Sequence, residues 1–246
     1  MPASVDAEQG HVRFPPSLRG LQDVNLGADL HQCVEQTTGL SLPFWVENDA
    51  NGAGLAESYF GAACGVRDFV TVLLCTGVGG ALMLDGVLHR GHTSMAGEIG
   101  HITIFPNGEQ CPCGSRGCLE TRASGKALIQ AARESNASLA NKVDLHYADL
   151  IAAAKAGDEQ ILGIFRSMGQ CLGIGIASIV NVINPAKVII SGSVAKGSEF
   201  FMPSVEEELR NREFAGMDCK VLVSELLEDA EIRAALSTFL YYQLQD

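Results

Sequence analysis

Two short segments, GEIGH at residues 97–101 and CPCGSRGCLE at residues 111–120, contain the densest group of metal-binding side chains in the chain. The group is one imidazole and three thiols, namely His101, Cys111, Cys113 and Cys118. Nitrogen and sulfur ligands this close in sequence can complete a tetrahedron around Zn²⁺ and leave no position for water, so we predict a structural zinc site. Reduced thiols without a metal and a disulfide are the alternatives.

Composition and charge are those of a globular protein. The chain has 246 residues, of which 47% are hydrophobic, enough for one large core or two smaller ones. Its formal net charge of -12 offers few cations to a phosphate backbone, which argues against nucleic acid as a partner. No apolar run approaches the roughly 20 residues of a membrane span, and residues 1–6 lack a signal pattern. We therefore expect a cytoplasmic chain with no membrane partner.

The five cysteines outside the cluster are scattered singly through apolar segments, unlike the dense pattern of a small disulfide scaffold. We expect them to be small buried side chains in a reducing compartment. They are Cys33, Cys64, Cys75, Cys171 and Cys219.

Short β-like runs alternate with helical stretches along the chain, which is the pattern of an α/β protein. Strands are expected at residues 44–46, 68–74, 81–84 and 187–190. Helices are expected at residues 50–60, 124–135, 147–156, 158–182 and 229–243. Turns are expected at residues 75–80, 85–86 and 191–193. The chain start, in contrast, reads as a Pro-containing loop.

Asp49 is the candidate catalytic base. A reaction that begins with the attack of a hydroxyl needs a carboxylate beside it, to orient it and to take its proton. Asp49 lies between the expected strand at 44–46 and the expected helix at 50–60, where ligand sites of α/β proteins gather. The alternative is that Asp49 is only the N-cap of that helix.

Two glutamates flank the predicted zinc ligands. Glu98 and Glu120 each lie within three residues of a zinc ligand, although carboxylates of this kind are ordinarily solvated at the surface. The hydroxyls of a small ligand need acceptors on a rigid frame, which a zinc-bound loop would supply. We therefore expect zinc to hold Glu98, His101 and Glu120 in fixed relative positions.

The two segments at 97–101 and 111–120 together closely resemble the signature of the ROK family. That family contains bacterial glucokinases, other hexose or N-acetylhexosamine kinases, and sugar-responsive repressors. The segment ENDAN at residues 47–51 matches the one that holds the catalytic Asp of ROK kinases, so the resemblance assigns Asp49 as the base. It also implies that the sugar is contacted by Asn48, Glu98, His101 and Glu120, and that His101 ligates zinc as well.

The nucleotide side is expected in three short segments. TGVGG at residues 76–80 would let backbone N–H groups and a hydroxyl approach phosphate oxygens, although an ordinary turn is the alternative. It resembles the second phosphate motif of the family, with Cys75 in place of a usual Gly. SGS at 191–193 resembles an adenosine-side glycine triplet, and IRAA at 232–235 a Gly-Ala-Ala segment with Arg233 for Gly. The resemblance implies ATP with Mg²⁺, held by Thr76, Gly77, Gly79, Gly80 and Gly192.

The resemblance implies the two-lobed α/β fold of actin-like, ribonuclease H-like ATPases. ROK kinases open with an Asp-x-Gly-x-Thr phosphate unit, which this sequence does not contain; residues 2–6 instead resemble a later sugar-side Pro-Gly loop, with Ala3 for Gly. We interpret the chain as a fragment of a longer protein or as one that lacks this unit. The expected lobes are an incomplete first lobe, residues 1–61 with helix 229–246, and a zinc-bearing, sugar-binding lobe, residues 62–228.

Three functional hypotheses follow. The first is an ATP-dependent hexose kinase, with glucose as the default sugar and an N-acetylhexosamine as a related possibility. The second is the sugar-sensing domain of a ROK repressor, which the altered glycines on the nucleotide side favour. The third is a degenerate kinase that neither phosphorylates nor regulates. Family members commonly form dimers through the zinc lobe, so a homodimer is expected.

Overall fold

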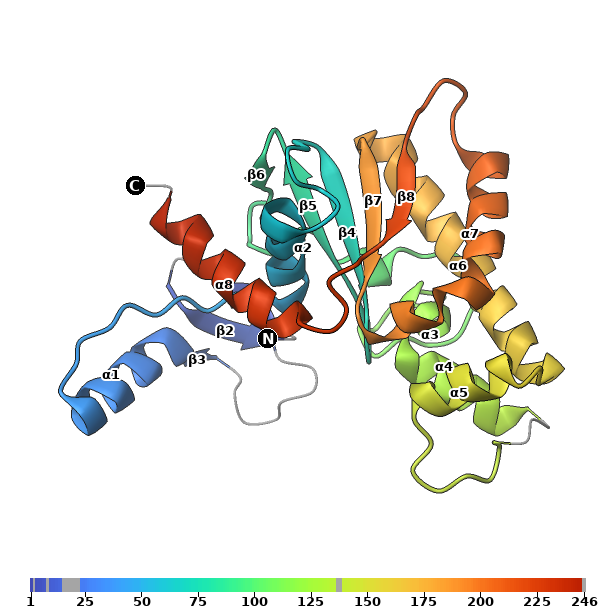
Figure 1. Cartoon of the computed structure of the whole chain (residues 1–246), viewed down its shortest axis with the longest axis horizontal. Helices are drawn as coiled ribbons and strands as arrows, with labels where there is room; N and C mark the ends of the chain where they lie inside the picture. The colour runs from blue at the N-terminus through green and yellow to red at the C-terminus, as the bar shows by residue number, and fades with distance from the viewer. Residues whose placement is uncertain (2, 8, 15–22, 136–138, 245–246) are drawn as a thin grey trace.

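The computed structural model describes residues 1, 3–7, 9–14, 23–135 and 139–244. Two sheets organise the described chain, and helices cover both faces of the larger one (Figure 1). The predicted α/β class is confirmed. Pro2, the first residue of the segment that resembles the Pro-Gly loop, and residues 245–246 of the expected C-terminal segment lie outside the described residues.

The larger sheet has five strands in the order β6-β5-β4-β7-β8. The strands are β4 (Phe69–Leu74), β5 (Val78–Leu84), β6 (Val87–Leu88), β7 (Lys187–Ser191) and β8 (Lys220–Val223). β4, β7 and β8 are parallel, whereas β5 and β6 extend the sheet as antiparallel strands. The β5–β6 hairpin turns at Asp85 and Gly86, both of which have positive φ, as predicted.

The five-stranded sheet is buried on both faces, because successive side chains of a strand point to opposite sides. Val70, Val72 and Leu74 join the core under α6 (Glu159–Ile183) and α7 (Ser198–Arg212). Phe69, on the other face, packs with Leu55 of α2 (Asp49–Phe60). α8 (Ala230–Gln243) lies across α2, where Gly52 leaves room for Ala234. The start of α2, which carries Asp49, is thus held between the sheet and the C-terminal helix.

Helix α6 is the longest element in the described chain and passes a test of length and composition for a membrane span, with a mean hydropathy of 1.3 over its most apolar window. In this fold 61% of that window is buried inside the molecule. Gly169 and Gly173 let α7 approach closely, since a Cβ on either would meet atoms of α7 within 3 Å. The packing is that of a core helix.

The segment between β6 and α6, which carries the four predicted metal ligands, contains several short elements, of which α4 and α5 lie at the opposite end of the molecule from α1 (Figure 1). In chain order these elements are the 3₁₀ helix η1 (Ile99–His101), α3 (Glu120–Ala123), α4 (Gly125–Glu134) and α5 (Tyr147–Lys155). A second 3₁₀ helix, η2 (Ser193–Gly197), follows β7.

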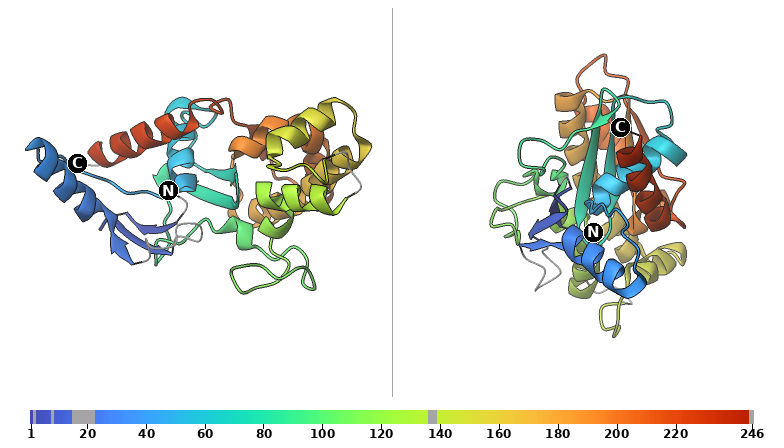
Figure 2. Two further views of the ribbon diagram at one scale, coloured as in Figure 1. Left: turned by 90° about the horizontal axis from the view of Figure 1, so that it is seen from below. Right: turned by 90° about the vertical axis from the view of Figure 1, so that its left-hand side faces the viewer.

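The smaller sheet is antiparallel, in the order β1-β2-β3, and its strands are β1 (Ser4–Asp6), β2 (His11–Phe14) and β3 (Val24–Asn25). Its core is small and includes Val5, Val12 and Val46. α1 (Leu26–Thr38) buries no residue and projects at the end of the elongated molecule (Figure 2). This part of the chain has much less core than the part around the larger sheet.

Three local predictions were wrong. Residues 44–46 form no strand; Trp45 instead stacks on Tyr242 of α8, with ring centroids 6.0 Å apart, so its aromatic ring packs on a helix. The chain start is not only a loop, because β1 pairs with β2. β5 begins at Val78, so Gly79 and Gly80 lie in a strand and not in a turn.

The prediction for the scattered cysteines was also wrong for most of them. Cys171 alone among the five is buried. Cys33 and Cys64 are exposed, and Cys75 and Cys219 are partly buried. The prediction failed because an apolar neighbourhood in sequence does not decide which face of an element points inward. α1 carries Cys33 and buries no residue at all.

Candidate functional site

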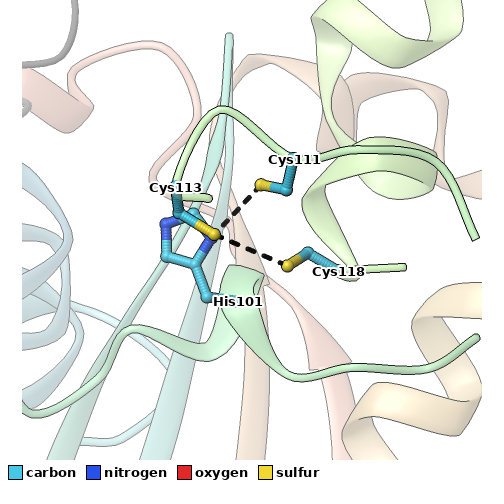
Figure 3. Close-up of side chains that lie close together, drawn as sticks. All are labelled: His101, Cys111, Cys113 and Cys118. Atoms are coloured by element: carbon cyan, nitrogen blue, oxygen red, sulfur yellow. Dashed lines mark hydrogen bonds between the residues drawn. The ribbon is translucent and has the colours of Figure 1, made fainter. Parts of the chain in front are cut away.

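The four predicted metal ligands converge (Figure 3). Their ligand atoms all lie within 4.8 Å of one another, and they belong to His101 at the end of η1 and to Cys111, Cys113 and Cys118 in the loop before α3. The separation of Cys113 Sγ and Cys118 Sγ is 3.7 Å. Two sulfurs bound to one tetrahedral Zn²⁺ would lie about 3.8 Å apart, given Zn–S bonds of about 2.3 Å. The residues present therefore fit a zinc ion.

The thiols differ in their surroundings. Burial raises the pKa of Cys111 to about 12, with the neighbouring thiols contributing, whereas the backbone N–H of Ser115 lowers the pKa of Cys113. Cys111 and Cys118 are buried and Cys113 is exposed. Metal binding requires thiolates, so a metal must displace protons from the two buried sulfurs.

His101 connects the metal cluster to a carboxylate. Its Nδ1 lies 3.7 Å from Cys111 Sγ, and its Nε2 lies 3.9 Å from Glu98 Oε2. One ring nitrogen thus faces the cluster while the other faces Glu98. A metal on Nδ1 would fix the orientation of the ring and, through it, the side that Nε2 presents to a ligand.

Asn48, and not Asp49, caps helix α2. Asn48 Oδ1 accepts hydrogen bonds from the backbone N–H groups of Ala50 (2.9 Å) and Asn51 (3.1 Å). Its Nδ2 donates to the carbonyl of Ala3 (3.0 Å), which ties the cap to the segment before β1. Asp49 is the first helical residue, and within the described residues its half-buried carboxylate accepts a hydrogen bond only from the neighbouring Ala50 N–H, at 3.1 Å. The N-cap alternative for Asp49 is therefore wrong.

Glu47, directly before the cap, anchors this segment. Its Oε1 accepts from the N–H of Asn48 (2.8 Å) and from Asn51 Nδ2 (3.0 Å). Its Oε2 pairs with Arg90 at 2.7 Å, and Arg90 also donates to the hydroxyl of Tyr242 at 2.7 Å. Burial and the Glu47 carboxylate raise the pKa of Tyr242. The network joins the start of α2, the loop after β6 and helix α8.

Asp49, Glu98 and Glu120 bring negative charge to one region. Partial burial raises the pKa of Glu98, the His101 imidazole opposes that rise, and the charges of Glu120 and Asp49 add to it. Glu120 Oε2 accepts the backbone N–H of Val78 at 2.9 Å, and its carboxylate lies against Gly77, where a Cβ would approach within 2.6 Å. Residues from η1, α2 and α3 thus act on one site.

A small cavity of about 30 Å³ adjoins the cap of α2. Its walls come from the segment at β1, the start of α2, β5 and the loop before η1. The lining residues are Ala3, Ser4, Asn48, Asn51, Gly79, Gly80, Ser94, Ala96, Gly97 and Glu98. Two of the predicted sugar ligands, Asn48 and Glu98, therefore share a cavity with polar side chains of other segments.

A larger cavity of about 640 Å³ lies between α4, α6 and the loop that carries Cys111, Cys113 and Cys118. Thr76 and Glu120 line it together, and Lys126 of α4 is a third polar member. The backbone N–H of Lys126 donates to the Thr76 carbonyl at 3.3 Å. The wall of this cavity thus joins a predicted sugar ligand to the start of the predicted phosphate segment. Asp49 and His101 line neither of the two cavities.

The predicted nucleotide residues do not all lie together. Gly79 and Gly80 line the small cavity; a Cβ on Gly79 would meet Ala50 and one on Gly80 would meet Ile99, so close packing explains both glycines. Gly192 follows β7 with φ 93°, and a Cβ there would meet Cys75 Sγ at 3.0 Å.

Arg233 lies at the start of α8. Its guanidinium is 3.7 Å from Asp229 and packs over the Phe60 ring. Cys75 and Gly192 are thus neighbours, whereas the contacts of Arg233 are with Asp229 and Phe60.

Sequence reasoning missed several groups at the site. Ser4, Arg90, Ser94 and Tyr242 line the small cavity or brace it. None belongs to a spacing pattern, although Ser4 lies within residues 2–6, which resemble the sugar-side loop. Glu47 is the first residue of the recognised segment at 47–51, and a buried carboxylate before a helix cap could have drawn attention to it.

Comparison with known proteins gives a consistent result. The ROK family model matches residues 1–240. The chain is 35% identical to a glucokinase of Thermotoga maritima, over 96% of this chain and 76% of that protein. It is 31% identical to the xylose repressor of Bacillus subtilis, over 94% of this chain and 57% of the repressor. The chain thus spans little more than half of that repressor's length.

Two solved structures are similar over most of the chain. A ROK family transcriptional regulator, a homologue of the Escherichia coli Mlc protein, has a TM-score of 0.83 at 32% identity, over 97% of this chain and 60% of that one. A ROK family glucokinase from Streptomyces griseus, in complex with glucose and AMPPNP, has a TM-score of 0.82 at 31% identity, over 95% and 78%. Kinases and regulators are therefore similarly close.

Proposed function

The chain belongs to the ROK family, and from this premise we propose that it phosphorylates a hexose, with ATP as the donor and glucose as the first candidate. The observation that carries the proposal is at the start of α2. Asn48 caps the helix, so the carboxylate of Asp49 is not used for capping and faces the charge of Glu98. A general base needs a carboxylate that is free to accept a proton, whereas a carboxylate that caps a helix is already hydrogen-bonded to backbone N–H groups.

Asp49 would orient the attacking hydroxyl and accept its proton as the O–P bond forms. Carboxylates contribute to such steps by position and by charge, since the transferring phosphoryl group demands little covalent chemistry from the protein. The fixed cap places Asp49 on a helix held by the larger sheet and α8. The packing of this helix on both sides therefore restricts the position of Asp49.

Glu98 and Glu120 would accept hydrogen bonds from the sugar hydroxyls, and His101 would donate to or accept from one of them. His101 has Nε2 available on the side away from the cluster. Zinc, when bound, would supply structural rigidity and no Lewis-acid step, because four protein ligands complete its coordination. Glu120 contacts the Val78 N–H in the described conformation, so sugar binding would exchange that bond for a sugar hydroxyl.

On the donor side, Thr76 and Gly77 would contact phosphate oxygens of ATP, with Mg²⁺ neutralising their charge. Gly192 would border the adenosine. Gly79 and Gly80 are better explained by packing and by the small cavity. A homodimer in the cytoplasm stays a prediction.

The test is a coupled assay of ADP release with ATP, Mg²⁺ and a panel of glucose, mannose, N-acetylglucosamine and N-acetylmannosamine. The assay is run on this chain and on any longer natural form of the protein. We expect turnover with glucose or mannose. Sugar-dependent ADP release supports the proposal. Its absence with every sugar, in both forms, contradicts it.

A sugar-sensing domain of a repressor is the second candidate. The observations that favour it are four altered positions on the nucleotide side and the similarity to a xylose repressor; the altered positions are Cys75, Ser191, Ser193 and Arg233. Such a domain would bind sugar with equal affinity in the presence and absence of ATP. Calorimetric titration of the sugar, with and without ATP, therefore separates the two candidates.

A further inference from the structure

One hydroxyl near the cap of α2 has no hydrogen-bond partner. The Oγ of Ser4 is buried, and no described residue donates to it or accepts from it. A buried polar group without a partner is destabilising, so such groups are rare in native proteins. An unpaired hydroxyl beside a cavity is therefore a sign of a missing ligand or water.

Ser4 is one of the residues that line the small cavity, together with Asn48 and Glu98. The volume of about 30 Å³ is close to that of one water molecule or one hydroxyl group. A single hydroxyl of a sugar therefore fits this cavity.

Ser94 provides a second, independent signal at the same cavity. It has φ 59°, a left-handed conformation that residues other than glycine rarely adopt. Strained backbone positions of this kind collect at functional sites, where surrounding contacts maintain them. Ser94 lines the same cavity as Ser4, and its hydroxyl makes no hydrogen bond within the described residues.

The loop that carries Ser94 is held by a backbone hydrogen bond and an ion pair. The N–H of Ala96 donates to the carbonyl of Arg90 at 2.9 Å, and Arg90 is fixed by the buried Glu47 at 2.7 Å. The position of Ser94 therefore depends on the same network that fixes the cap of α2. Ser4 is tied to that cap as well, because Asn48 Nδ2 donates to the carbonyl of Ala3.

We propose that the hydroxyls of Ser4 and Ser94 together bind one hydroxyl of the hexose and set the selectivity for sugars that carry it. This inference rests on the proposed function, since it needs a sugar in the site. A site built to pair with a substrate hydroxyl rejects the analogue without it, because its own polar groups then stay unpaired. Ser4 is such a group, because its hydroxyl has no protein partner.

Two other buried hydroxyls provide matched controls. Thr71 and Ser237 are buried and unpartnered like Ser4, but they line neither cavity. Ser237→Ala removes a hydroxyl of the same kind from α8. Any effect of losing an unpaired buried hydroxyl on folding alone appears in this variant as well.

The experiment measures the dissociation constants of glucose and of 2-deoxy-, 3-deoxy- and 4-deoxyglucose by calorimetry, without ATP. For the wild type we expect at least tenfold weaker binding of one deoxy sugar. In Ser4→Ala we expect glucose to bind about tenfold more weakly and the discrimination at that same position to shrink below threefold. Discrimination at the other positions, and the whole profile of Ser237→Ala, should match the wild type.

Further variants separate hydroxyl loss from backbone effects. Ser94→Ala removes the hydroxyl and keeps a side chain at positive φ, whereas Ser94→Gly also relieves the strain; both should lose discrimination at the position affected by Ser4→Ala. Ser4→Thr, which keeps a hydroxyl at this position, should retain the discrimination. If Ser4→Ala and Ser94→Ala discriminate among the deoxy sugars as the wild type does, the inference is overturned. The proposed function still stands in that case, provided that glucose binds. No binding of any sugar by the wild type contradicts the proposed function itself.

Discussion

The proposed sugar side and the proposed nucleotide side of the candidate site are built differently. On the proposed sugar side, residues 47–51 and 94–120 contain the polar groups, and hydrogen bonds, a buried ion pair and the cluster of His101 with three cysteines surround them. On the nucleotide side, residues 75–77 and 191–193 approach each other, but Cys75 occupies the space beside Gly192 and Arg233 pairs with Asp229 instead.

The difference shows which part of the function the chain is best organised to perform. A preorganised site binds tightly because its groups need little ordering when the ligand arrives. The sugar side meets that description, whereas the nucleotide side offers fewer groups and more substitutions. We therefore expect changes on the two sides to affect the two substrates separately.

The largest effect is expected for Asp49→Asn. Loss of the base should lower kcat by about 10³-fold, because general-base catalysis commonly contributes 10²- to 10⁴-fold, while KM for the sugar changes little. Steady-state kinetics with glucose and ATP measures both constants.

Asp29→Asn is the matched control for Asp49→Asn. Asp29 also lies in the first turn of a helix that an Asn caps, so both changes remove a similar interaction with the helix dipole. Asp29→Asn should keep full kcat. An Asp49→Asn variant with near-normal kcat would remove Asp49 from its role.

Disruption of the metal cluster should have the next largest effect. Cys113→Ser should lose zinc and lower the free energy of unfolding by roughly 4 kcal/mol, a fraction of the 10–16 kcal/mol that zinc contributes in zinc-finger peptides. KM for the sugar should rise, because Glu98 and His101 lose their frame, while KM for ATP stays close to normal. Zinc content and denaturant unfolding measure the first two effects.

Cys33→Ser is the control for the metal cluster, because Cys33 is an exposed thiol on α1. It should retain zinc and stability. Equal stability of the wild type with and without a chelator would rule out a structural metal.

Removal of the Arg90 guanidinium tests the bracing network. Arg90→Met leaves the carboxylate of Glu47, whose side chain is 4% exposed, without its ion-pair partner. We expect a loss of about 3 kcal/mol of stability, since an unpaired buried charge is costly. Thermal unfolding measures it.

Arg67→Met provides the comparison for Arg90→Met. The ion pair of Arg67 with Asp85 is solvent-exposed, so its loss should cost less than about 1 kcal/mol. Equal destabilisation by the two variants would mean that the Glu47 network adds nothing to an ordinary surface pair.

The smallest effect is expected on the nucleotide side. Cys75→Gly removes the thiol beside Gly192 and should lower KM for ATP by about threefold, a gain of less than 1 kcal/mol, with no change in KM for the sugar. Cys64→Gly, an exposed site, is the control and should leave both constants unchanged. A changed sugar KM in Cys75→Gly would break the separation of the two sides.

The convergence of His101, Cys111, Cys113 and Cys118 could be predicted from sequence because these residues lie within eighteen positions. Most helices were predicted for the same reason, since periodicity and caps are local signals. The assignment of Asn48 and Asp49 to one site also followed from a short segment, and the capping bonds then separated their roles.

The features that sequence could not predict depend on distant contacts. Residues 44–46 have strand-like composition, but Trp45 packs on Tyr242, almost 200 positions later. Gly79 and Gly80 resemble a phosphate turn until the positions of Ala50 and Ile99 show why a Cβ is excluded. The unpaired hydroxyl of Ser4 is visible only when Asn48 and Ser94 are in place around it.

Transfer of phosphate from ATP to glucose, detected by mass spectrometry of the sugar product, tests the central claim most directly. The account predicts a hexose phosphate that forms with the wild type and Asp29→Asn and is nearly absent with Asp49→Asn. Glucose binding without any phosphorylated product from the wild type would contradict it and would favour a sugar sensor.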